Sequence, residues 1–219
     1  MRQDAACRDR KPRLVFGHVS SAVSNPALSG AANVTRRELN PRQAETVERV
    51  LAAALDELRA VGFDGLTIRM VAGRAGVAPA TAYTYFASKN HLVAEVFWRR
   101  LNERPRVEAS KKSPLDRVIA VFDDLAVFLA AEPELASAVT MALLGTEPDV
   151  MHLRVMIGTE INTRIQDALG PNVSHAVVDA LSIAWGGALL QAGMGHARVE
   201  AIGTRLASVA RLLLPEDAS

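Results

Sequence analysis

Two tyrosines are the residues whose type and spacing first suggest chemistry. The chain has 219 residues and two tyrosines, Tyr83 and Tyr85, both within the stretch VAPATAYTYF at 77–86. On a helix, positions two apart point about 200° away from each other, so one core cannot hold both rings. Ala82 and Phe86, four apart, are better candidates for the core. At least one phenol must therefore reach the surface, either to bond a phosphate oxygen or to meet only water.

The tyrosines need a helix to hold them, and the flanking residues predict one. Thr67 is placed to N-cap a short helix over 68–75, which Gly76 ends. Pro79 suits the first position of a second short helix, which runs to about Phe86. The two short helices are thus joined by a turn that contains glycine.

Longer helices are predicted on both sides of this pair. The preceding one begins near Arg42, repeats apolar residues at the i, i+3, i+4 spacing of one buried stripe, and closes at Gly62. The following one is capped by Ser88 and stops at Pro105. A long helix packed on two short ones that are joined by a turn is a helix-turn-helix, whose second short helix enters the major groove of DNA.

Charge is distributed unevenly along the chain. The formal net charge is +1, which alone suggests no nucleic-acid partner. Up to residue 42, however, the basic residues are Arg2, Arg8, Arg10, Lys11, Arg13, Arg36, Arg37 and Arg42, against Asp4, Asp9 and Glu38. Residues 1–40 also lack a sustained period, so we predict a flexible basic arm there, which either faces DNA or is a solvated tail.

The remaining composition excludes several classes of protein. A single cysteine, Cys7, rules out an intrachain disulfide and any cysteine-cluster metal site. No apolar run reaches the roughly 18 residues that span a bilayer, and nothing resembles a signal peptide. The histidines are scattered, without the spacing of metal ligands or of a nucleophile and its base. We therefore expect a soluble cytoplasmic protein with no catalytic residue, metal, cofactor or membrane partner.

The stretch LTIRMVAGRAGVAPATAYTYFASKNHL at 66–92 resembles the DNA-binding signature of the TetR family of bacterial one-component regulators. The matching features are Leu-Thr opening the second helix, Ala-Gly-Val at the turn, Thr-x-Tyr-x-Tyr-Phe on the recognition helix and Ser-Lys-x-x-Leu opening the fourth helix. The resemblance implies an all-α fold. A three-helix DNA-binding domain at 41–88 would be followed by a larger helical domain at 89–219 that binds an effector and dimerises.

The resemblance also implies two sets of DNA-contacting residues. The phosphate contacts would be Thr67, Thr81, Tyr83, Tyr85 and Lys89. The residues facing the major groove would be Arg69, Ala78, Pro79, Ala80 and Thr84. Arg42, together with Arg36 and Arg37, could track phosphate or enter a minor groove, the alternative being a solvated linker.

The groove-facing set differs from that of common family members, which often carry a polar or basic side chain where this chain has Ala-Pro-Ala at 78–80. Arg69 is its one long donor, able to address guanine through two hydrogen bonds. Ala78, Ala80 and the methyl of Thr84 could contact thymine methyls instead. We therefore expect DNA shape to contribute much of the specificity.

The chain from about Ser113 to Leu214 has the pattern of several packed helices. The expected helices cover 115–131, 133–144, 148–169, 173–193 and 199–213. Soft and bulky residues on these helices and on the one before them could line a cavity, or could be plain core. The candidates are Phe97, Phe122, Leu125, Phe128, Met141, Met156 and Trp185, with Trp98 and Met151 beside them. They are nearly free of charge, which favours a lipophilic small molecule as the effector.

The run SIAWGGALLQAGMG at 182–195 carries two adjacent glycines inside a predicted helix. Glycine there costs roughly 1 kcal/mol relative to alanine, so Gly186 and Gly187 beside Ala188 need a reason. Close approach of a partner helix is one, and a kink beside the effector site is the other. On the first interpretation these residues, with Leu206 and Val209 of the last helix, form the interface of a homodimer.

Together these features predict a homodimeric regulator that binds a palindromic operator and releases it when a lipophilic molecule binds. An activator of the same fold is the alternative within transcription. From another class, the chain could be an adaptor that uses its helix-turn-helix for protein contacts only. Phosphate-type groups around one helix, Tyr83, Tyr85 and Lys89, favour DNA over that adaptor.

Overall fold

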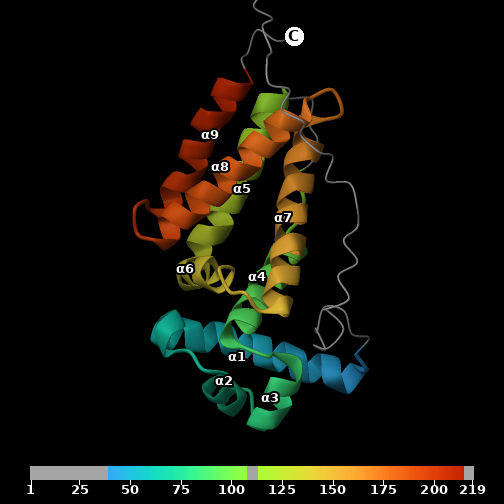
Figure 1. The fold of residues 1–219 in the computed structure, drawn as a ribbon, viewed down its shortest axis with the longest axis vertical. Coiled ribbons are helices and arrows are strands. Elements are labelled where there is room, and N and C mark those ends of the chain that lie inside the picture. Colours follow the sequence, from blue (N-terminus) through green and yellow to red (C-terminus); the bar gives the residue numbers. More distant parts are fainter. Residues whose placement is uncertain (1–38, 108–112, 215–219) are drawn as a thin grey trace, which may run out of the picture. The chain divides into compact units, whose positions relative to one another are not determined.

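The computed structural model describes residues 39–107 and 113–214, which lie in one compact unit and form helices without any strand (Figure 1). The helices are α1 (Pro41–Gly65), α2 (Ile68–Arg74), α3 (Pro79–Tyr85), α4 (Lys89–Glu103), α5 (Pro114–Ala131), α6 (Pro133–Ala142), α7 (Pro148–Leu169), α8 (His175–Gly193) and α9 (Ile202–Leu213), the last preceded by the short 3-10 helix η3 (Val199–Ala201). The prediction of an all-α fold is confirmed. The predicted arm at 1–40 lies outside the described residues except for its last two.

Side-chain caps fix where the N-terminal helices begin. The Asn40 side chain accepts a hydrogen bond from the Gln43 amide, and the Gln43 side chain accepts one from the Asn40 amide, each at 3.0 Å. Thr67 accepts from the Met70 amide and so begins α2, as predicted. Ser88 does the same for α4. Each cap satisfies an amide that the first turn of a helix leaves without a partner.

Two glycines set the turns of the helix-turn-helix. Gly62 has φ 67° and ψ 179°, so α1 leaves helical geometry there before one further turn to Gly65. Gly76, between α2 and α3, has φ 66°. A residue with a side chain adopts such positive φ values only with strain, which glycine avoids. The sequence predicted both breaks, although α1 resumes after the first.

The buried side chains form one cluster that extends from α1 to α9. In the N-terminal part, α1 packs on α2 and α3, and Val50, Ala82 and Phe86 are fully buried between them. In the rest, α5 packs on α7 and α9, while α8 packs on α6, α7 and α9 (Figure 1). α4 contacts α1, α6 and α7. This helix therefore joins the helix-turn-helix to the larger set of helices.

A glycine that the sequence did not single out closes the contact between α6 and α8. A Cβ on Gly193, the last residue of α8, would lie 2.5 Å from Cγ2 and 2.6 Å from Cβ of Thr140. The Thr140 hydroxyl bonds the Ala136 carbonyl at 3.1 Å, so this side chain is not free to move away. Two helices of the same chain thus approach closely at Gly193, whereas the approach of a partner helix at Gly186 and Gly187 stays a prediction.

Gly193→Ala is expected to lower the free energy of unfolding by about 1–3 kcal/mol, the usual cost of overpacking a filled site. Gly158→Ala is the matched control, because nothing lies within 4 Å of a Cβ at that exposed position of α7. It should raise the free energy of unfolding by up to about 1 kcal/mol through helix propensity. Urea unfolding followed by circular dichroism measures both, and equal changes would contradict the tight contact.

Candidate nucleic-acid interface and effector domain

Three of the predicted phosphate contacts meet around one open hollow of about 410 Å³. Thr67 at the start of α2, Tyr83 on α3 and Lys89 at the start of α4 all line it. These residues give the hollow two hydroxyls and one ammonium, and its lining also includes Ser88, with a third hydroxyl, and the acidic residue Asp64. The first turn of α4 also carries amides that lack a partner within the helix and favour an anion. A phosphate oxygen is the kind of group that this surface can bind.

The two tyrosines point in different directions, as the helix geometry required. Tyr83 is 53% exposed, whereas Tyr85 is 7% exposed and belongs to the core beside the fully buried Ala82 and Phe86. The expectation of one exposed phenol is confirmed. Burial of Tyr85 does not fit its predicted phosphate contact, because the side chain that was expected to face DNA packs into the core instead.

Lys89 has a structural contact that the sequence did not indicate. Its Nζ donates a hydrogen bond to the Phe63 carbonyl at 3.0 Å and lies 4.5 Å from the centroid of the Phe63 ring. The side chain thereby holds the end of α1 against the beginning of α4. An ammonium has three donors, so this bond leaves others for a phosphate.

The residues predicted to face the major groove are on the surface. Ala78, Pro79, Ala80, Thr84 and Arg69 are exposed, as is Arg42 in the first turn of α1, and Thr81 is half-buried. Arg69 makes no ion pair with any residue in the described parts of the chain, so its guanidinium is available. The Thr84 hydroxyl donates to the Ala80 carbonyl at 3.0 Å, which leaves its methyl as the group for base contacts.

Most residues predicted to line an effector cavity are packed together in the core. Phe97, Phe122, Leu125, Phe128 and Trp185 are all buried. The rings of Phe97 and Phe128 lie 5.5 Å apart between centroids. Met156 is half-buried. Met141 is 50% exposed, which contradicts its predicted place in an enclosed cavity, because its position on α6 faces solvent rather than the core.

The outer face of α8 is apolar and uncovered. Ile183 is 76% exposed, Leu190 39% and Met194 53%. Between them, Gly186 and Gly187 have nothing within 4 Å of where a Cβ would lie. Among the described helices α8 alone is long and apolar enough to cross a membrane by length and composition, and a single such helix is weak evidence for doing so. An uncovered apolar stripe on one helix is also typical of a protein–protein contact.

The other residues predicted for the dimer interface differ in exposure. Ala188 and Val209 are half-buried. Leu206 is 1% exposed, because this face of α9 packs on α5, so the prediction that it contacts a partner is wrong. The apolar residue that α9 does expose is Leu212, at 84%.

The loop between α6 and α7 holds the start of α4. Asn90 donates to Glu147 Oε1 at 2.9 Å, and Ser88 also hydrogen bonds to the Glu147 side chain. Burial raises the pKa of the Glu147 carboxyl, but these bonds and backbone amides outweigh burial and hold the pKa below its ordinary value of 4.5. The residues directly after the recognition helix are therefore tied to the beginning of α7.

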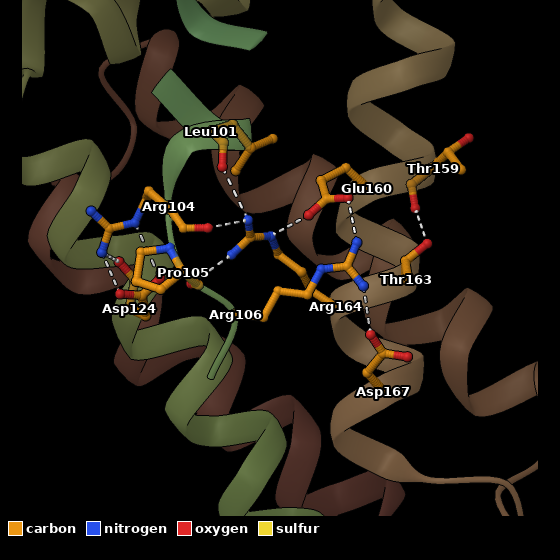
Figure 2. Close-up of polar contacts among 10 residues, drawn as sticks. All are labelled: Leu101, Arg104, Pro105, Arg106, Asp124, Thr159, Glu160, Thr163, Arg164 and Asp167. Carbon is orange, nitrogen blue, oxygen red and sulfur yellow. Dashed lines mark hydrogen bonds and ion pairs between the residues drawn. The ribbon is translucent and has the colours of Figure 1, made fainter. Parts of the chain in front are cut away.

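The other end of α4 is also held by α7, through the buried side chain of Arg164 (Figure 2). Its guanidinium donates to the carbonyls of Leu101 and Arg104, each at 3.0 Å, and of Pro105 at 3.3 Å. These carbonyls belong to the end of α4 and the residues after it. The last carbonyls of a helix have no amide of a following turn to accept from. Arg164 is therefore a C-terminal cap supplied by another helix.

Acidic side chains keep this guanidinium in place. Glu160, one turn before Arg164 on α7, accepts from its Nε at 2.8 Å and from Arg106 at 2.8 Å. Arg106 also pairs with Asp167, and Arg104 pairs with Asp124 of α5 (Figure 2). Sequence reasoning assigned Glu160 no such role, although the Glu–Arg spacing of four residues on one helix was the available signal.

Comparison with known proteins finds a matching family profile, a relative by sequence and two solved structures of similar fold. The sequence profile of the bacterial regulatory proteins of the tetR family matches residues 50–96. An uncharacterized HTH-type transcriptional regulator of Mycobacterium tuberculosis (strain ATCC 25618 / H37Rv) is 46% identical over 178 residues, which cover 80% of this chain and 83% of that protein. A TetR transcriptional regulator from Rhodococcus sp. RHA1 has the same fold, with a TM-score of 0.64 at 22% identity over 81% of this chain and 100% of the other. Thermus thermophilus FadR, a TetR family transcriptional repressor in complex with lauroyl-CoA, superposes with a TM-score of 0.58 at 21% identity over 77% and 93% of the two chains.

Proposed function

The chain belongs to the TetR family of bacterial transcriptional regulators, and on that premise we propose that it is a homodimeric repressor. In this proposal each α3 lies in the major groove at one half of a palindromic operator. A lipophilic molecule that binds among α4 to α8 makes the repressor release the operator. The observation that carries the proposal is the hollow at which Thr67, Tyr83 and Lys89 meet beside the exposed face of α3.

Phosphate contacts position the protein, and the neighbouring exposed residues read the bases. Thr67, Tyr83 and Lys89, with Thr81, would bond phosphates on the two sides of the groove. Arg69 is exposed without an ion pair in the described residues and is the candidate for a bidentate contact with guanine. The short side chains at 78–80 allow the backbone of α3 to approach the groove floor closely. This arrangement favours recognition by methyl contacts and DNA shape.

The effector is proposed to be a long-chain acyl compound. The core residues Phe97, Phe122, Phe128 and Trp185 offer apolar surface and no charge, and they come from α4, α5 and α8. The FadR protein of similar fold was solved with lauroyl-CoA, an acyl thioester of this kind. Because these side chains are packed together, an acyl chain would have to separate the helices. That separation is what could change the position of α4.

The dimer is proposed to form through the outer face of α8. Ile183, Leu190 and Met194, with the open glycines between them, would meet the same residues of a second copy across a twofold axis. A dimer places two recognition helices in two successive major grooves on one face of DNA, which is what a palindromic operator requires. An activator would use the same contacts, and an adaptor would not need the hollow.

Two substitutions separate phosphate contacts from base readout. Lys89→Met keeps the carbon stem over Phe63 but removes the charge, so it should weaken binding to all DNA sequences similarly. The slope of log affinity against log salt should fall by about 0.9 for each phosphate that is no longer neutralised, hence by roughly two in a dimer. Arg69→Ala should instead cost about 1–3 kcal/mol at particular base pairs of each half-site. Fluorescence anisotropy with the region upstream of its own gene and with random DNA measures both.

Arg211→Ala is the matched control, because it removes one exposed positive charge from α9, away from the helix-turn-helix. It should change neither the salt slope nor the base preference. For the effector, lauroyl-CoA is titrated against the preformed complex of protein and operator. Release of operator is the expected result. Equal affinity of the wild-type protein for its upstream region and for random DNA would contradict the proposed function.

A further inference from the structure

His91 is a buried histidine that the proposed contacts with DNA and effector do not use. It lies on α4 and is 1% exposed. One ring nitrogen, Nδ1, faces two different groups: the amide of Ala87 at 3.3 Å and Oδ2 of Asp149 at 3.7 Å. The other nitrogen, Nε2, is buried and has no hydrogen-bond partner in the described residues.

The two neighbours of Nδ1 require opposite protonation states. The Ala87 amide donates its hydrogen, so Nδ1 must be an unprotonated acceptor, and the proton of the neutral ring is then on Nε2. The Asp149 carboxylate accepts, so a bond to it requires a protonated Nδ1. One nitrogen cannot make both bonds at once. Protonation must therefore break the first bond and favour the second.

The two neighbours also belong to different parts of the fold. Ala87 follows α3 by two residues, so its amide fixes the exit of the recognition helix. Asp149 lies in the first turn of α7, which the loop at Glu147 already ties to α4. We propose that His91 is a proton-operated switch that holds the exit of the recognition helix when neutral and the start of α7 when charged. This inference rests on the proposed function of α3 for its effect on DNA.

The surroundings of His91 set the direction of the pH dependence. Burial lowers the pKa of the imidazole from its ordinary value of 6.5, while the carboxylates of Asp149, Glu95 and Glu147 act in the opposite direction. Glu95 is itself fully buried on α4 and pairs with Arg99. The Phe86 ring is also close, with its centroid 5.6 Å from that of the His91 ring. Because the pKa is lowered, the folded protein holds His91 neutral at pH 7.

Acid should therefore act on both stability and DNA binding. As the pH falls below 6.5, the unfolded chain binds a proton at this histidine before the folded chain does, so stability is present above that value and is lost as the pH falls to the folded pKa. Operator affinity should begin to fall at lower pH, where the folded chain itself takes up the proton, because protonation of the folded chain releases Ala87. If the pKa of His91 differs by one unit between the free and the DNA-bound protein, operator affinity changes about tenfold for each subunit.

His91→Asn tests the switch, since the asparagine oxygen can take the place of Nδ1 and accept from Ala87 without titrating. The wild-type protein should lose about tenfold or more in operator affinity between pH 7.5 and about one unit below the pH at which the folded chain takes up this proton. The variant should keep its affinity over that range, whereas the control His175→Asn, which replaces an exposed histidine at the start of α8, should lose affinity as the wild type does. Asp149→Asn should move the loss to lower pH.

Nitrogen-15 NMR of the histidine rings, recorded without DNA, tests the switch independently of the proposed function. A proton on Nε2 alone at pH 7.5, with protonation of Nδ1 at lower pH, is the expected result. Two outcomes would overturn the proposal: a proton on Nδ1 at pH 7.5, or a pH profile of stability and affinity that His91→Asn shares with the wild type. If no operator is bound at any pH, the proposed function fails, and the NMR and stability profiles still decide on the switch.

Discussion

Ile183→Glu is expected to convert the proposed dimer to a monomer and to lower operator affinity by about 10²–10⁴-fold, the range by which two linked binding sites exceed one. Ile183 is the most exposed residue of the α8 stripe, at 76%, so the monomer can solvate the new carboxylate. In the dimer, two copies of that carboxylate would be buried in an apolar contact without a partner, which costs several kcal/mol. Sedimentation velocity and fluorescence anisotropy measure the two effects.

Val127→Glu is the matched control, because Val127 is 65% exposed on α5, a helix away from the α8 stripe. It should leave both the dimer and operator binding unchanged. Gly187→Leu tests the same surface by size rather than charge. Nothing in the described chain lies near that position, so the monomer should fold while the partner helix is pushed away. A dimer that survives Ile183→Glu but not Val127→Glu would show that the interface lies elsewhere.

The parts of the fold that sequence alone could predict are those governed by local physics. Thr67 and Ser88 begin their helices because a hydroxyl bonds an amide three residues on, which requires no knowledge of the rest of the chain. Pro79 begins α3, and Gly76 turns before it, for equally local reasons. The residues expected to contact DNA came from the resemblance of this motif to the TetR family, and their contact with DNA stays a prediction.

The predictions that were wrong concern which helix covers a given face of another helix. Helical spacing showed that Tyr83 and Tyr85 could not share a core, but it could not say which of them α1 and α2 would bury. Leu206 belongs to an apolar face of α9, and only the packing of α5 on that face removes it from the interface. Met141 is apolar, yet it lies where no described helix covers it. The type of a residue indicates whether its side chain prefers burial, whereas tertiary packing decides whether burial occurs.

Arg164 is the largest omission from the sequence prediction, because arginine is rarely fully buried and is expected on a surface. Its place in the core depends on acceptors at Leu101 and Arg104, which lie 63 and 60 residues earlier in the chain. No local pattern carries that information. The four-residue spacing from Glu160 indicates an ion pair on one helix but not what the remaining donors bind.

Arg164→Met is expected to lower the free energy of unfolding by about 3–5 kcal/mol, the cost of removing one partner of a buried ionic network. Methionine fills a similar volume but leaves the carbonyls of Leu101, Arg104 and Pro105 without the donor that now satisfies them. The Leu101 carbonyl would keep its bond from the Arg104 amide and Pro105 is exposed, so most of the loss is expected from Glu160, whose carboxylate loses its buried partner. Urea unfolding followed by circular dichroism measures the change.

The control is Arg106→Met, which removes a guanidinium that also contacts Glu160 but is 48% exposed at its side chain. A surface pair contributes only about 0–1 kcal/mol, so this variant should unfold nearly as the wild type does. Arg164→Lys should recover only part of the loss, because one ammonium cannot reproduce the planar fork that reaches three carbonyls and Glu160 together. If Arg164→Met costs no more than Arg106→Met, solvent already satisfies the end of α4, and the bonds of Arg164 do not hold that helix.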